Sequence, residues 1–259
     1  MSGGTIIRND EGGVATLTLN RPQARNALSI GLMQDLRHDL EDIAGDPALK
    51  AIVIRGEGPA FCAGHDLKEM RANNDPDFIR RTFELCSQLM QTVVHQPQPV
   101  IAQVHGVATA AGCQLVASCD LAIAAETARF ATPGVNIGLF CSTPQVALSR
   151  TVSRKHAMEM LLTGDMVSAA HAAEIGLINR AVADDTLGAE VDQLARQIAS
   201  KSGKVVRFGK AAFQRQLGLD LSDAYAAMTE AMIENMGFKD ADEGINAFLE
   251  KRPPDWKER

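Results

Sequence analysis

The first half of the chain alternates short apolar runs with longer helical patterns. Residues 14–20 (VATLTLN) alternate apolar and polar side chains, as a strand does, and stop at the turn NRPQ. Residues 51–56 (AIVIRG) form a β-branched run that ends in glycine, and residues 100–106 and 121–126 are similar apolar runs. Runs of this length and composition predict buried strands.

Helical periodicity fills the stretches between these runs and dominates later. Ser29 is placed to cap a helix whose apolar face consists of Leu32, Met33, Leu36, Leu40 and Ile43. A second pattern runs from Phe78 to His95 and ends at QPQP, since a residue before proline disfavours helix. The stretch 110–120 (AAGCQLVASCD) predicts a helix between two strands. Further helices are predicted over 157–163, 168–176, 184–201, 204–217, 222–237 and 240–251.

This order of elements predicts an α/β core followed by a helical extension. We place the core in residues 1–200 and the helical region in residues 201–259. Neither an internal repeat nor an obvious linker divides the sequence, so two independent domains are not expected.

Composition and charge narrow the function classes. The hydrophobic content of 46% and charged content of 22% are ordinary for a soluble globular protein. A formal net charge of -6 argues against a nucleic-acid-binding surface, which needs a concentrated basic face, but leaves room for a small anionic ligand. Because no apolar run reaches the roughly 18 residues that span a bilayer, we expect no membrane insertion.

Cysteine usage and the first residues predict the compartment. The five cysteines form no CxxC pair and have no histidine at metal-ligand spacing, so we expect reduced, buried thiols and no metal site. The start MSGGTIIRNDEGG carries neither an apolar signal core nor an Arg/Ser-rich transit pattern. From these features we predict a cytoplasmic protein.

Two segments place tiny residues where a strand gives way to a helix. They are residues 60–70 (AFCAGHDLKEM) and residues 104–124 (VHGVATAAGCQLVASCDLAIA). Backbone N–H groups are unpaired at such junctions, and a ligand can approach the backbone closely. Together with residues 20–29 (NRPQARNALS) and 162–182 (LTGDMVSAAHAAEIGLINRAV), these segments resemble the enoyl-CoA hydratase/isomerase family, the crotonase superfamily. The sequences of these segments are most similar to those of its "enoyl-CoA hydratase domain-containing" subgroup.

The resemblance covers nearly the whole chain and implies a spiral of ββα units with a C-terminal helical oligomerisation region. Trimers or dimers of trimers are usual in the family, so we expect a homotrimer or a dimer of trimers. The apolar stripe of residues 222–237 suits such an interface, although it could equally pack on its own core; it consists of Ala224, Ala227, Met228, Ala231 and Met232.

In the family, two backbone N–H groups bind the thioester oxygen. The resemblance assigns them to His65, which follows Gly64, and to Ala111, which stands for the middle glycine of a family triplet. Backbone donors tolerate side-chain changes provided that φ at Ala111 is negative. Small residues also let a helix pack closely against a strand, but the presence of both motifs in the family's order favours the oxyanion hole.

Both catalytic glutamates of the hydratases are absent. The resemblance places them at Gln114 and at Gly134, and an amide cannot accept a proton near pH 7. We therefore expect weak ordinary hydration. Two alternatives stay open. One is an activity like that of the methylmalonyl-CoA decarboxylases, which share the Gly-His-Asp motif at residues 64–66; the other is an acyl-CoA-binding pseudoenzyme. We interpret Cys141 as core packing.

The remaining candidates concern coenzyme A, which belongs to the thioester substrate, so no separate cofactor is expected. The resemblance implies a lining from the first loop, the GHD segment, the small-residue triplet and the C-terminal helix: Ala24, Arg25, Ala63, Gly64, Asp66, Leu67, Lys68, Gly112, Phe248 and Lys251. The lysines would act as point charges toward phosphate. The carboxylates of Asp66 and Asp120 sit where they would cap a helix or fix a strand end.

Overall fold

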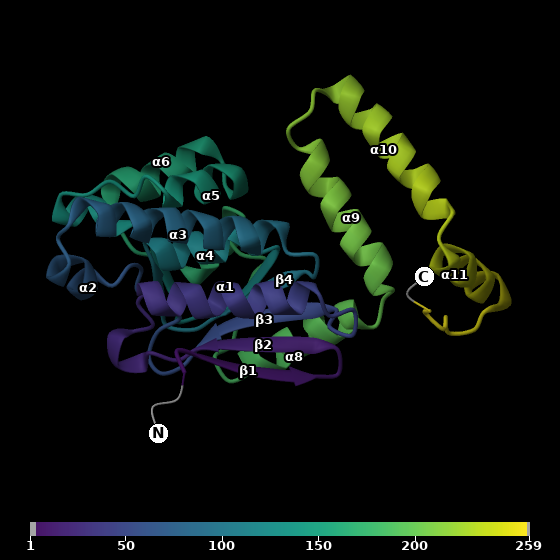
Figure 1. The fold of residues 1–259 in the computed structure, drawn as a ribbon, viewed down its shortest axis with the longest axis horizontal. Helices are drawn as coiled ribbons and strands as arrows, with labels where there is room; N and C mark the ends of the chain where they lie inside the picture. Colours follow the sequence, from purple (N-terminus) through teal and green to yellow (C-terminus); the bar gives the residue numbers. More distant parts are fainter. Residues whose placement is uncertain (1–3, 258–259) are drawn as a thin grey trace.

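The computed structural model describes residues 4–257 and arranges its described strands in two sheets (Figure 1). The strands are β1 (Ile6–Glu11), β2 (Val14–Leu19), β3 (Ala51–Gly56), β4 (Val100–Val104), β5 (Val107–Thr109), β6 (Leu121–Ala125), β7 (Arg129–Ala131), β8 (Val167–Ser168) and β9 (Arg180–Val182). The main sheet has the order β1-β2-β3-β4-β6-β9 and is parallel except for the β1–β2 pair.

The second sheet is small and has the order β5-β7-β8. It arises because β4 and β6 are each followed by a short strand that leaves the main sheet. The apolar run predicted over 100–106 therefore ends as a strand at Val104, and residues 107–109 pair with β7 instead. Repetition of this step gives the expected spiral of ββα units.

Eleven α-helices lie within the described residues. They are α1 (Ile30–Ala44), α2 (Leu67–Ala72), α3 (Pro76–His95), α4 (Ala111–Ser118), α5 (Pro144–Thr151), α6 (Arg154–Thr163), α7 (Ala169–Glu174), α8 (Leu187–Ala199), α9 (Gly203–Gln216), α10 (Leu221–Met236) and α11 (Lys239–Glu250). Two 3-10 turns, η1 (Pro22–Ala24) and η2 (Pro133–Ile137), complete the fold.

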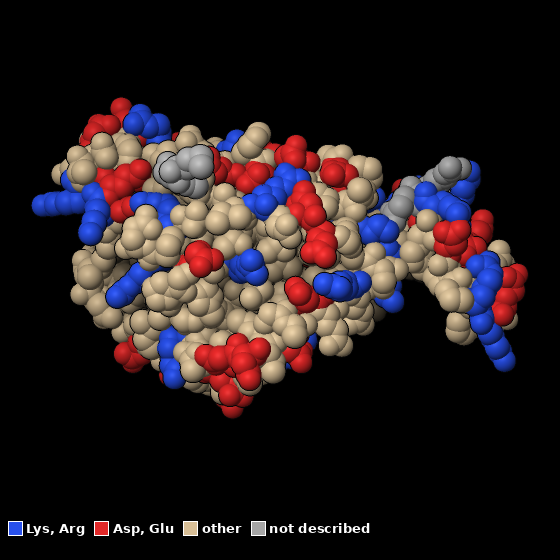
Figure 2. All heavy atoms as spheres, turned by 90° about the horizontal axis from the view of Figure 1, so that it is seen from below, with Lys and Arg blue, Asp and Glu red and all other residues tan. Residues whose placement is uncertain are grey.

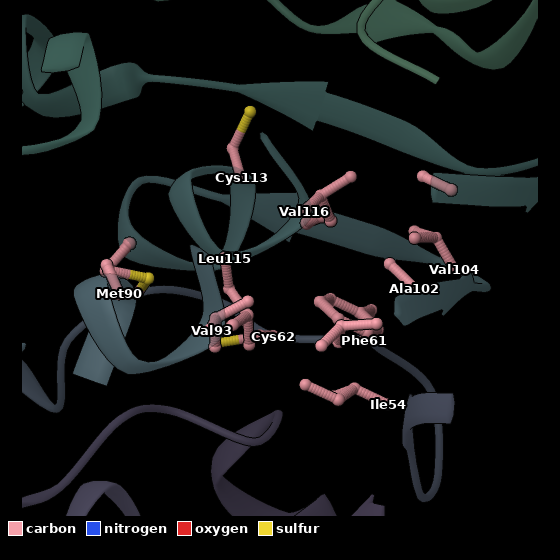
Figure 3. Close-up of a cluster of buried hydrophobic side chains, with 14 of the residues drawn as sticks. Ile54, Phe61, Cys62, Met90, Val93, Ala102, Val104, Cys113, Leu115 and Val116 are labelled. Carbon is pink, nitrogen blue, oxygen red and sulfur yellow. The ribbon is translucent and has the colours of Figure 1, made fainter. Parts of the chain in front are cut away.

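Alternate side chains of each central strand face opposite layers of the core. Ile52 and Ile54 belong to the large cluster that also contains the buried side chains of α1, α3 and α4. Val53 belongs to a second cluster with Leu187 and Val191 of α8. Figure 3 shows part of the large cluster, in which Ile54, Phe61, Leu115 and Val116 lie together. The site segments are thus mounted on a sheet covered on both faces.

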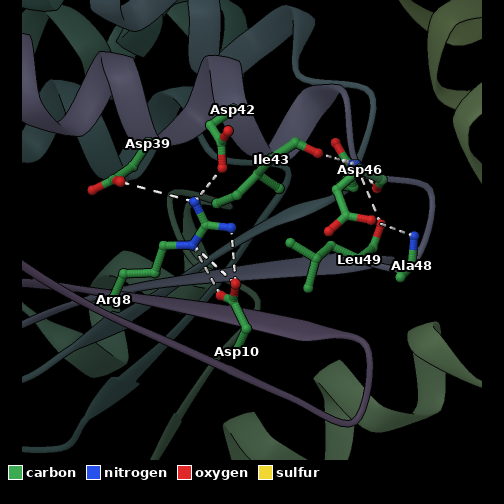
Figure 4. A network of polar contacts seen from close by, with 9 residues as sticks. Arg8, Asp10, Asp39, Asp42, Ile43, Asp46, Ala48 and Leu49 are labelled. Atoms are coloured by element: carbon green, nitrogen blue, oxygen red, sulfur yellow. Dashed lines mark hydrogen bonds and ion pairs between the residues drawn. The ribbon is translucent and has the colours of Figure 1, made fainter.

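The prediction for α1 is confirmed in detail. The Ser29 hydroxyl accepts the Leu32 N–H at 3.2 Å, and all five residues of the predicted apolar face are buried. Such a cap stabilises a helix by about 1 kcal/mol. Arg8 ties β1 to the outer face of α1, because its guanidinium lies between Asp10, 2.8 Å from Nη2, and Asp42, 2.6 Å from Nη1 (Figure 4).

The last three helices extend away from the sheet (Figure 1). From below, the end of the chain containing α11 forms a smaller lobe beside the body, and charges of both signs are interspersed on this face (Figure 2). The Lys210 ammonium of α9 meets the Asp120 carboxylate at 2.5 Å, and that carboxylate also accepts the Val100 N–H. Asp120 therefore fixes a strand end, as expected, and joins the helical region to the core.

The apolar stripe of α10 is only partly covered within one chain. Ala231 is buried, but Met232 is 62% exposed. Nearby, the Trp256 indole donates to the Ser200 carbonyl at 2.9 Å and holds the C-terminal segment against the end of α8. The use of the exposed part of the stripe as an oligomer interface stays a prediction.

Candidate active site

The two small-residue segments lie side by side, as the resemblance implies. The Cys62 N–H donates to the Val107 carbonyl at 3.1 Å, and the Thr109 N–H donates to the Cys62 carbonyl at 2.9 Å. At Gly64, where φ is 95°, a Cβ would lie 2.9 Å from the Ala110 side chain. Only glycine fits this left-handed position at so close an approach.

Backbone hydrogen bonds of the flanking residues fix the position of the His65 N–H group, which itself makes no hydrogen bond within the described residues. The Leu28 N–H donates to the Gly64 carbonyl at 2.8 Å, and the Asp66 N–H donates to the Leu28 carbonyl at 3.2 Å. This pairing fixes the peptide on both sides of His65. Within residues 4–257, no hydrogen-bond acceptor is found for the His65 N–H itself.

The Ala111 N–H is the second open donor. Ala111 is the first residue of α4, and no acceptor for its N–H is found among the described residues. Its φ is not positive, so alanine is tolerated there as predicted. The strain falls one residue earlier, at Ala110, which has φ 50° and ψ -117°. A non-glycine residue in such a region costs on the order of 1–3 kcal/mol and is often found at functional sites.

Gly112 has a packing role. A Cβ at this position would lie 2.1 Å from the Cys62 carbonyl oxygen. The close approach of α4 to the first segment therefore requires glycine at 112. It also brings the Ala111 nitrogen beside Gly64, where it would lie 3.5 Å from a Cβ at residue 64. Close packing and the open donors are consequences of the same geometry.

Gln114 lies one helical turn after Ala111 and is 4% exposed. Its amide oxygen Oε1 is buried without a hydrogen-bond partner among the described residues. Buried polar atoms are paired in the great majority of cases, so this unpaired oxygen is unusual. The amide can orient a ligand or water but cannot take up a proton near neutral pH.

Gly134 is excluded from carrying a side chain by contact rather than by conformation. Its φ is not positive, but a Cβ would lie 2.8 Å from the Leu139 carbonyl oxygen and 3.0 Å from the Cys141 thiol. Cys141 is itself 7% exposed and belongs to the large core cluster, which agrees with a packing role.

The His65 side chain is half-buried, and both of its ring nitrogens are shielded from solvent. Its ring meets the edge of the Phe83 ring at 5.1 Å between centroids, and neither ring nitrogen has a hydrogen-bond partner within residues 4–257. Burial lowers the pKa of His65 to about 4, against a smaller opposing effect from the backbone of Leu28. At neutral pH one ring nitrogen is therefore a donor and the other an acceptor.

Asp66 is structural in this geometry. Its carboxylate accepts the N–H groups of Lys68 and Glu69 at 3.1 Å and so caps α2, and it pairs with the Arg21 guanidinium at 2.8 Å. Its place in the coenzyme A lining gains no direct contact from this arrangement. Arg21 itself was not among the predicted site residues, although the motif NRPQARNALS contains it.

Asn26 is a second residue that the sequence analysis did not single out. It is fully buried at φ 53°, and its amide accepts the Arg21 N–H and donates to the Glu57 and Ala60 carbonyls. Asn26 thereby fixes the first loop to the segment that precedes Gly64. The signal that could have found it is an asparagine in a turn, where side-chain–backbone bonds and positive φ are common.

The residues expected around coenzyme A fall into two groups. Ala24 and Arg25 belong to the first loop, Ala63 to the segment before Gly64, and Leu67 and Lys68 to the start of α2; the side chains of Arg25 and Lys68 are exposed. Phe248, 82% exposed, and Lys251 belong to the end of α11. Figure 1 shows α2 and α11 at opposite ends of the molecule, so one chain does not bring the two groups together.

Four of the five cysteines, Cys62, Cys86, Cys113 and Cys141, are buried, as predicted, and Cys119 is half-buried. The cysteines are free, and burial raises the pKa of Cys62, Cys86 and Cys113 to about 12 and raises that of Cys141. In the part of the chain that the structure describes, no group of three or more His, Cys, Asp or Glu side chains is placed to hold a metal ion. Over the same residues, no helix combines the length and apolarity needed to cross a membrane.

Comparison with known proteins agrees with the arrangement of the two segments. The family model described as enoyl-CoA hydratase/isomerase matches residues 9–259. The chain is 49% identical over 244 residues to the mitochondrial enoyl-CoA hydratase domain-containing protein 3 of Rattus norvegicus, covering 94% of this chain and 81% of that protein. It is 48% identical to the human protein of the same name, with 94% and 80% covered.

Solved structures show the same fold. An enoyl-CoA hydratase from Mycobacterium smegmatis superimposes with a TM-score of 0.96 at 50% identity, covering 98% of this chain and 99% of that one. The human enoyl Coenzyme A hydratase domain-containing protein 3 gives a TM-score of 0.95 at 47% identity, with 97% and 100% covered. The fold prediction, an α/β crotonase spiral with C-terminal helices, is thus confirmed.

The predicted cytoplasmic location is wrong by the same comparison. The relatives of 47–49% identity from five vertebrates are all named mitochondrial. The prediction failed because buried, reduced thiols do not distinguish one intracellular compartment from another.

Proposed function

Because this chain belongs to the enoyl-CoA hydratase/isomerase family, we propose that it binds an acyl-CoA thioester through the N–H groups of His65 and Ala111. The observation that carries this proposal is the pair of open backbone donors on two segments that lie side by side. Donors fixed in advance of the reaction stabilise the negative charge that develops on a thioester oxygen. Removal of one such donor typically lowers the rate about 10²–10³-fold.

We further propose that ordinary hydration by this enzyme is weak. By the family resemblance, Gln114 and Gly134 correspond to the glutamates of the hydratases, and neither residue can transfer a proton near neutral pH. Each such group usually contributes about 10²–10⁴-fold, although the contributions do not simply multiply. Gln114 would then orient a ligand or water, while the buried position of Gly134 leaves no space for a side chain.

Decarboxylation is the second candidate reaction. It requires stabilisation of an enolate and little help from a base, so a site with two donors and no carboxylate suits it. His65 makes decarboxylation less favourable. Its lowered pKa means that the side chain provides no positive charge for the carboxylate of such a substrate. The third possibility, an acyl-CoA-binding protein without turnover, would show tight binding and no reaction with any thioester.

We propose that coenzyme A is held by two copies of the chain. Lys68 and Arg25 would approach it from the copy that supplies the donors, and Phe248 and Lys251 from a neighbour. The separation of α2 and α11 within one chain supports this division (Figure 1). It fits the homotrimer, or dimer of trimers, that the family resemblance implies.

Comparison of a thioester with its thioether tests the oxyanion hole directly. Butyryl-CoA and S-butyl-CoA share the nucleotide and the alkyl chain, but S-butyl-CoA lacks the carbonyl oxygen. Two lost hydrogen bonds predict about tenfold weaker binding of the thioether by isothermal titration calorimetry. Free coenzyme A serves as the control for the nucleotide. Equal dissociation constants for the two ligands would contradict the proposed role of the two N–H groups.

A further inference from the structure

The chain that follows α11 folds back along that helix. Residues 252–257, which we call the C-terminal strap, follow Lys251, where the helix ends in a left-handed conformation with φ 56°. The Arg252 N–H donates to the Ala247 carbonyl at 3.0 Å and closes the last turn of α11. The strap is exposed along its length except at Trp256, which is half-buried. Polar contacts therefore determine most of its course.

The Arg252 side chain holds the first part of the strap against α11. Its two terminal nitrogens donate to the Glu243 carboxylate at 2.6 and 3.0 Å, and its Nε donates to the Glu250 carboxylate at 2.6 Å. A bidentate pair of this kind fixes the orientation of both groups. Glu243 also accepts the Asp255 N–H at 2.7 Å, and these bonds lower the pKa of Glu243 to about 2. The carboxylate thus holds the strap at two points.

Trp256 anchors the far end of the strap to the core. Its indole N–H donates to the Ser200 carbonyl, which directly follows α8, at 2.9 Å. Its ring lies against Gly244 of α11, where a Cβ would be 3.2 Å from the ring. Because α8 packs on the main sheet through Leu187 and Val191, Trp256 connects α11 to the body of the molecule.

A buried carboxylate adds a second anchor beside the first. Asp240, 1% exposed at the start of α11, accepts the Lys257 N–H at 2.8 Å and the Ser202 hydroxyl hydrogen at 2.5 Å. A cavity of about 500 Å³ separates parts of α9, α10 and α11 next to Trp256. Figure 1 also shows α11 far from the main sheet. The position of α11 relative to the core therefore depends on the strap.

The proposed function divides coenzyme A between Lys68 of one copy and Lys251 of a neighbour. Lys251 directly precedes Arg252, so a strap that came loose would also displace the ammonium that meets the phosphates. On the basis of this division, we infer that the C-terminal strap positions Lys251 for the coenzyme A of a neighbouring copy, with Arg252 and Trp256 as positioning residues. Placement matters because the attraction between an ammonium and a phosphate falls with distance and is screened by water and salt.

A double-mutant cycle tests whether Arg252 acts through Lys251. Dissociation constants of free coenzyme A are measured by isothermal titration calorimetry at a protein concentration where copies associate. We expect Arg252→Gln to weaken binding about threefold or more in the wild-type background and to add little in the Lys251→Ala background. In the Lys68→Ala background it should keep its full effect. Trp256→Ala, which removes the other anchor, should give the same pattern.

Arg8→Gln is the matched control for Arg252→Gln. Arg8 is likewise held by two carboxylates, those of Asp10 and Asp42, but it joins β1 to α1. Its substitution should leave the affinity for coenzyme A unchanged. Trp256 is the only tryptophan of the chain, so its fluorescence reports on the strap directly. In Arg252→Gln we expect the emission to shift to longer wavelength while sedimentation shows the same association as in wild type.

Three results would overturn the inference. The first is unchanged binding in both Arg252→Gln and Trp256→Ala. The second is an equal effect of Arg252→Gln with and without Lys251, and the third is loss of association, because the strap would then act on folding or assembly. If Lys251→Ala leaves the affinity unchanged, the proposed division of the coenzyme fails and the inference falls with it. A loss in Lys251→Ala without a loss in the strap variants refutes the inference alone.

Discussion

The Arg21 guanidinium and the Asp66 carboxylate form an ion pair, with 2.8 Å between Nη2 and Oδ2, that joins the first loop to the start of α2. The other terminal nitrogen of Arg21 donates to the Ala27 carbonyl at 2.7 Å. Asp66 also caps α2 through the N–H groups of Lys68 and Glu69. These contacts hold the segment that presents the His65 N–H against the first loop.

Arg21 is accordingly a positioning residue, and Arg21→Gln should loosen the His65 donor. We expect kcat to fall about tenfold for whichever thioester reaction the enzyme performs, with KM changed less, because a misplaced oxyanion donor costs transition-state stabilisation. Steady-state kinetics measure kcat and KM, and thermal unfolding measures whether the substitution also changes stability. Arg37→Gln, which removes a surface pair with Glu41, is the control. An unchanged kcat in Arg21→Gln would exclude the positioning role.

The shielded His65 imidazole should make stability depend on pH. Its pKa falls from 6.5 to about 4 on folding, so between these values the unfolded chain binds more protons than the native chain. Stability from this group is therefore complete above pH 6.5 and lost as the pH falls toward 4, by at most about 3 kcal/mol. Urea unfolding of wild type and His65→Phe at pH 7 and 4.5 should show a smaller loss in the variant. Equal losses would mean that folding does not shield the His65 imidazole in its neutral form.

Gly134 should resist any side chain. Gly134→Ala places a Cβ 2.8 Å from the Leu139 carbonyl, so we expect a destabilisation of about 1–3 kcal/mol in chemical denaturation. Gly31→Ala in α1 is the control, because a Cβ there meets no atom within 4 Å and should stabilise slightly. A neutral Gly134→Ala would show that the segment after η2 moves freely. In that case a glutamate introduced at position 134 would also cost less stability than the contacts of a Cβ there indicate.

Substitution of the two lysines expected near coenzyme A should affect binding of the coenzyme differently as the protein is diluted. Lys68→Ala should weaken binding of the coenzyme at every protein concentration, and the loss should shrink as salt screens the phosphates. Lys251→Ala should weaken binding only at concentrations where copies of the chain associate, because α11 lies far from α2 in one chain. Titrations at two protein concentrations, with Lys155→Ala as a surface control, distinguish these cases. Unchanged affinity in both variants at low salt would remove the assignment.

Sequence patterns predicted the long elements well and the short ones poorly. The apolar face of α1, its Ser29 cap and the end of α3 before QPQP follow from periodicity and local chemistry, and the structure confirms them. The strands of the second sheet contain only two or three residues each, too few for a period to be read, and β1 carries mostly exposed or half-buried side chains.

The site shows the same division. The family resemblance proposed the N–H groups of His65 and Ala111 as donors, and the glycines at 64 and 112 allow the close approach of the two segments that this proposal requires. The unpaired nitrogens of His65 could not be predicted, since they depend on how α3 packs over the ring. The distance between Lys68 and Lys251 is likewise a property of the chain's path and leaves no local signal in the sequence.

Hydration of crotonyl-CoA by the wild-type protein tests the central claim most directly: an intact cradle for the thioester oxygen beside positions that cannot transfer protons. The measurement follows loss of the enoyl absorbance at saturating substrate, with binding of crotonyl-CoA to the same preparation measured by calorimetry. We predict tight binding together with a kcat far below the value of about 10 s⁻¹ that is typical of enzymes. A kcat of about 10 s⁻¹ or more would contradict the account, because some group other than Gln114 and Gly134 would then supply the proton transfer.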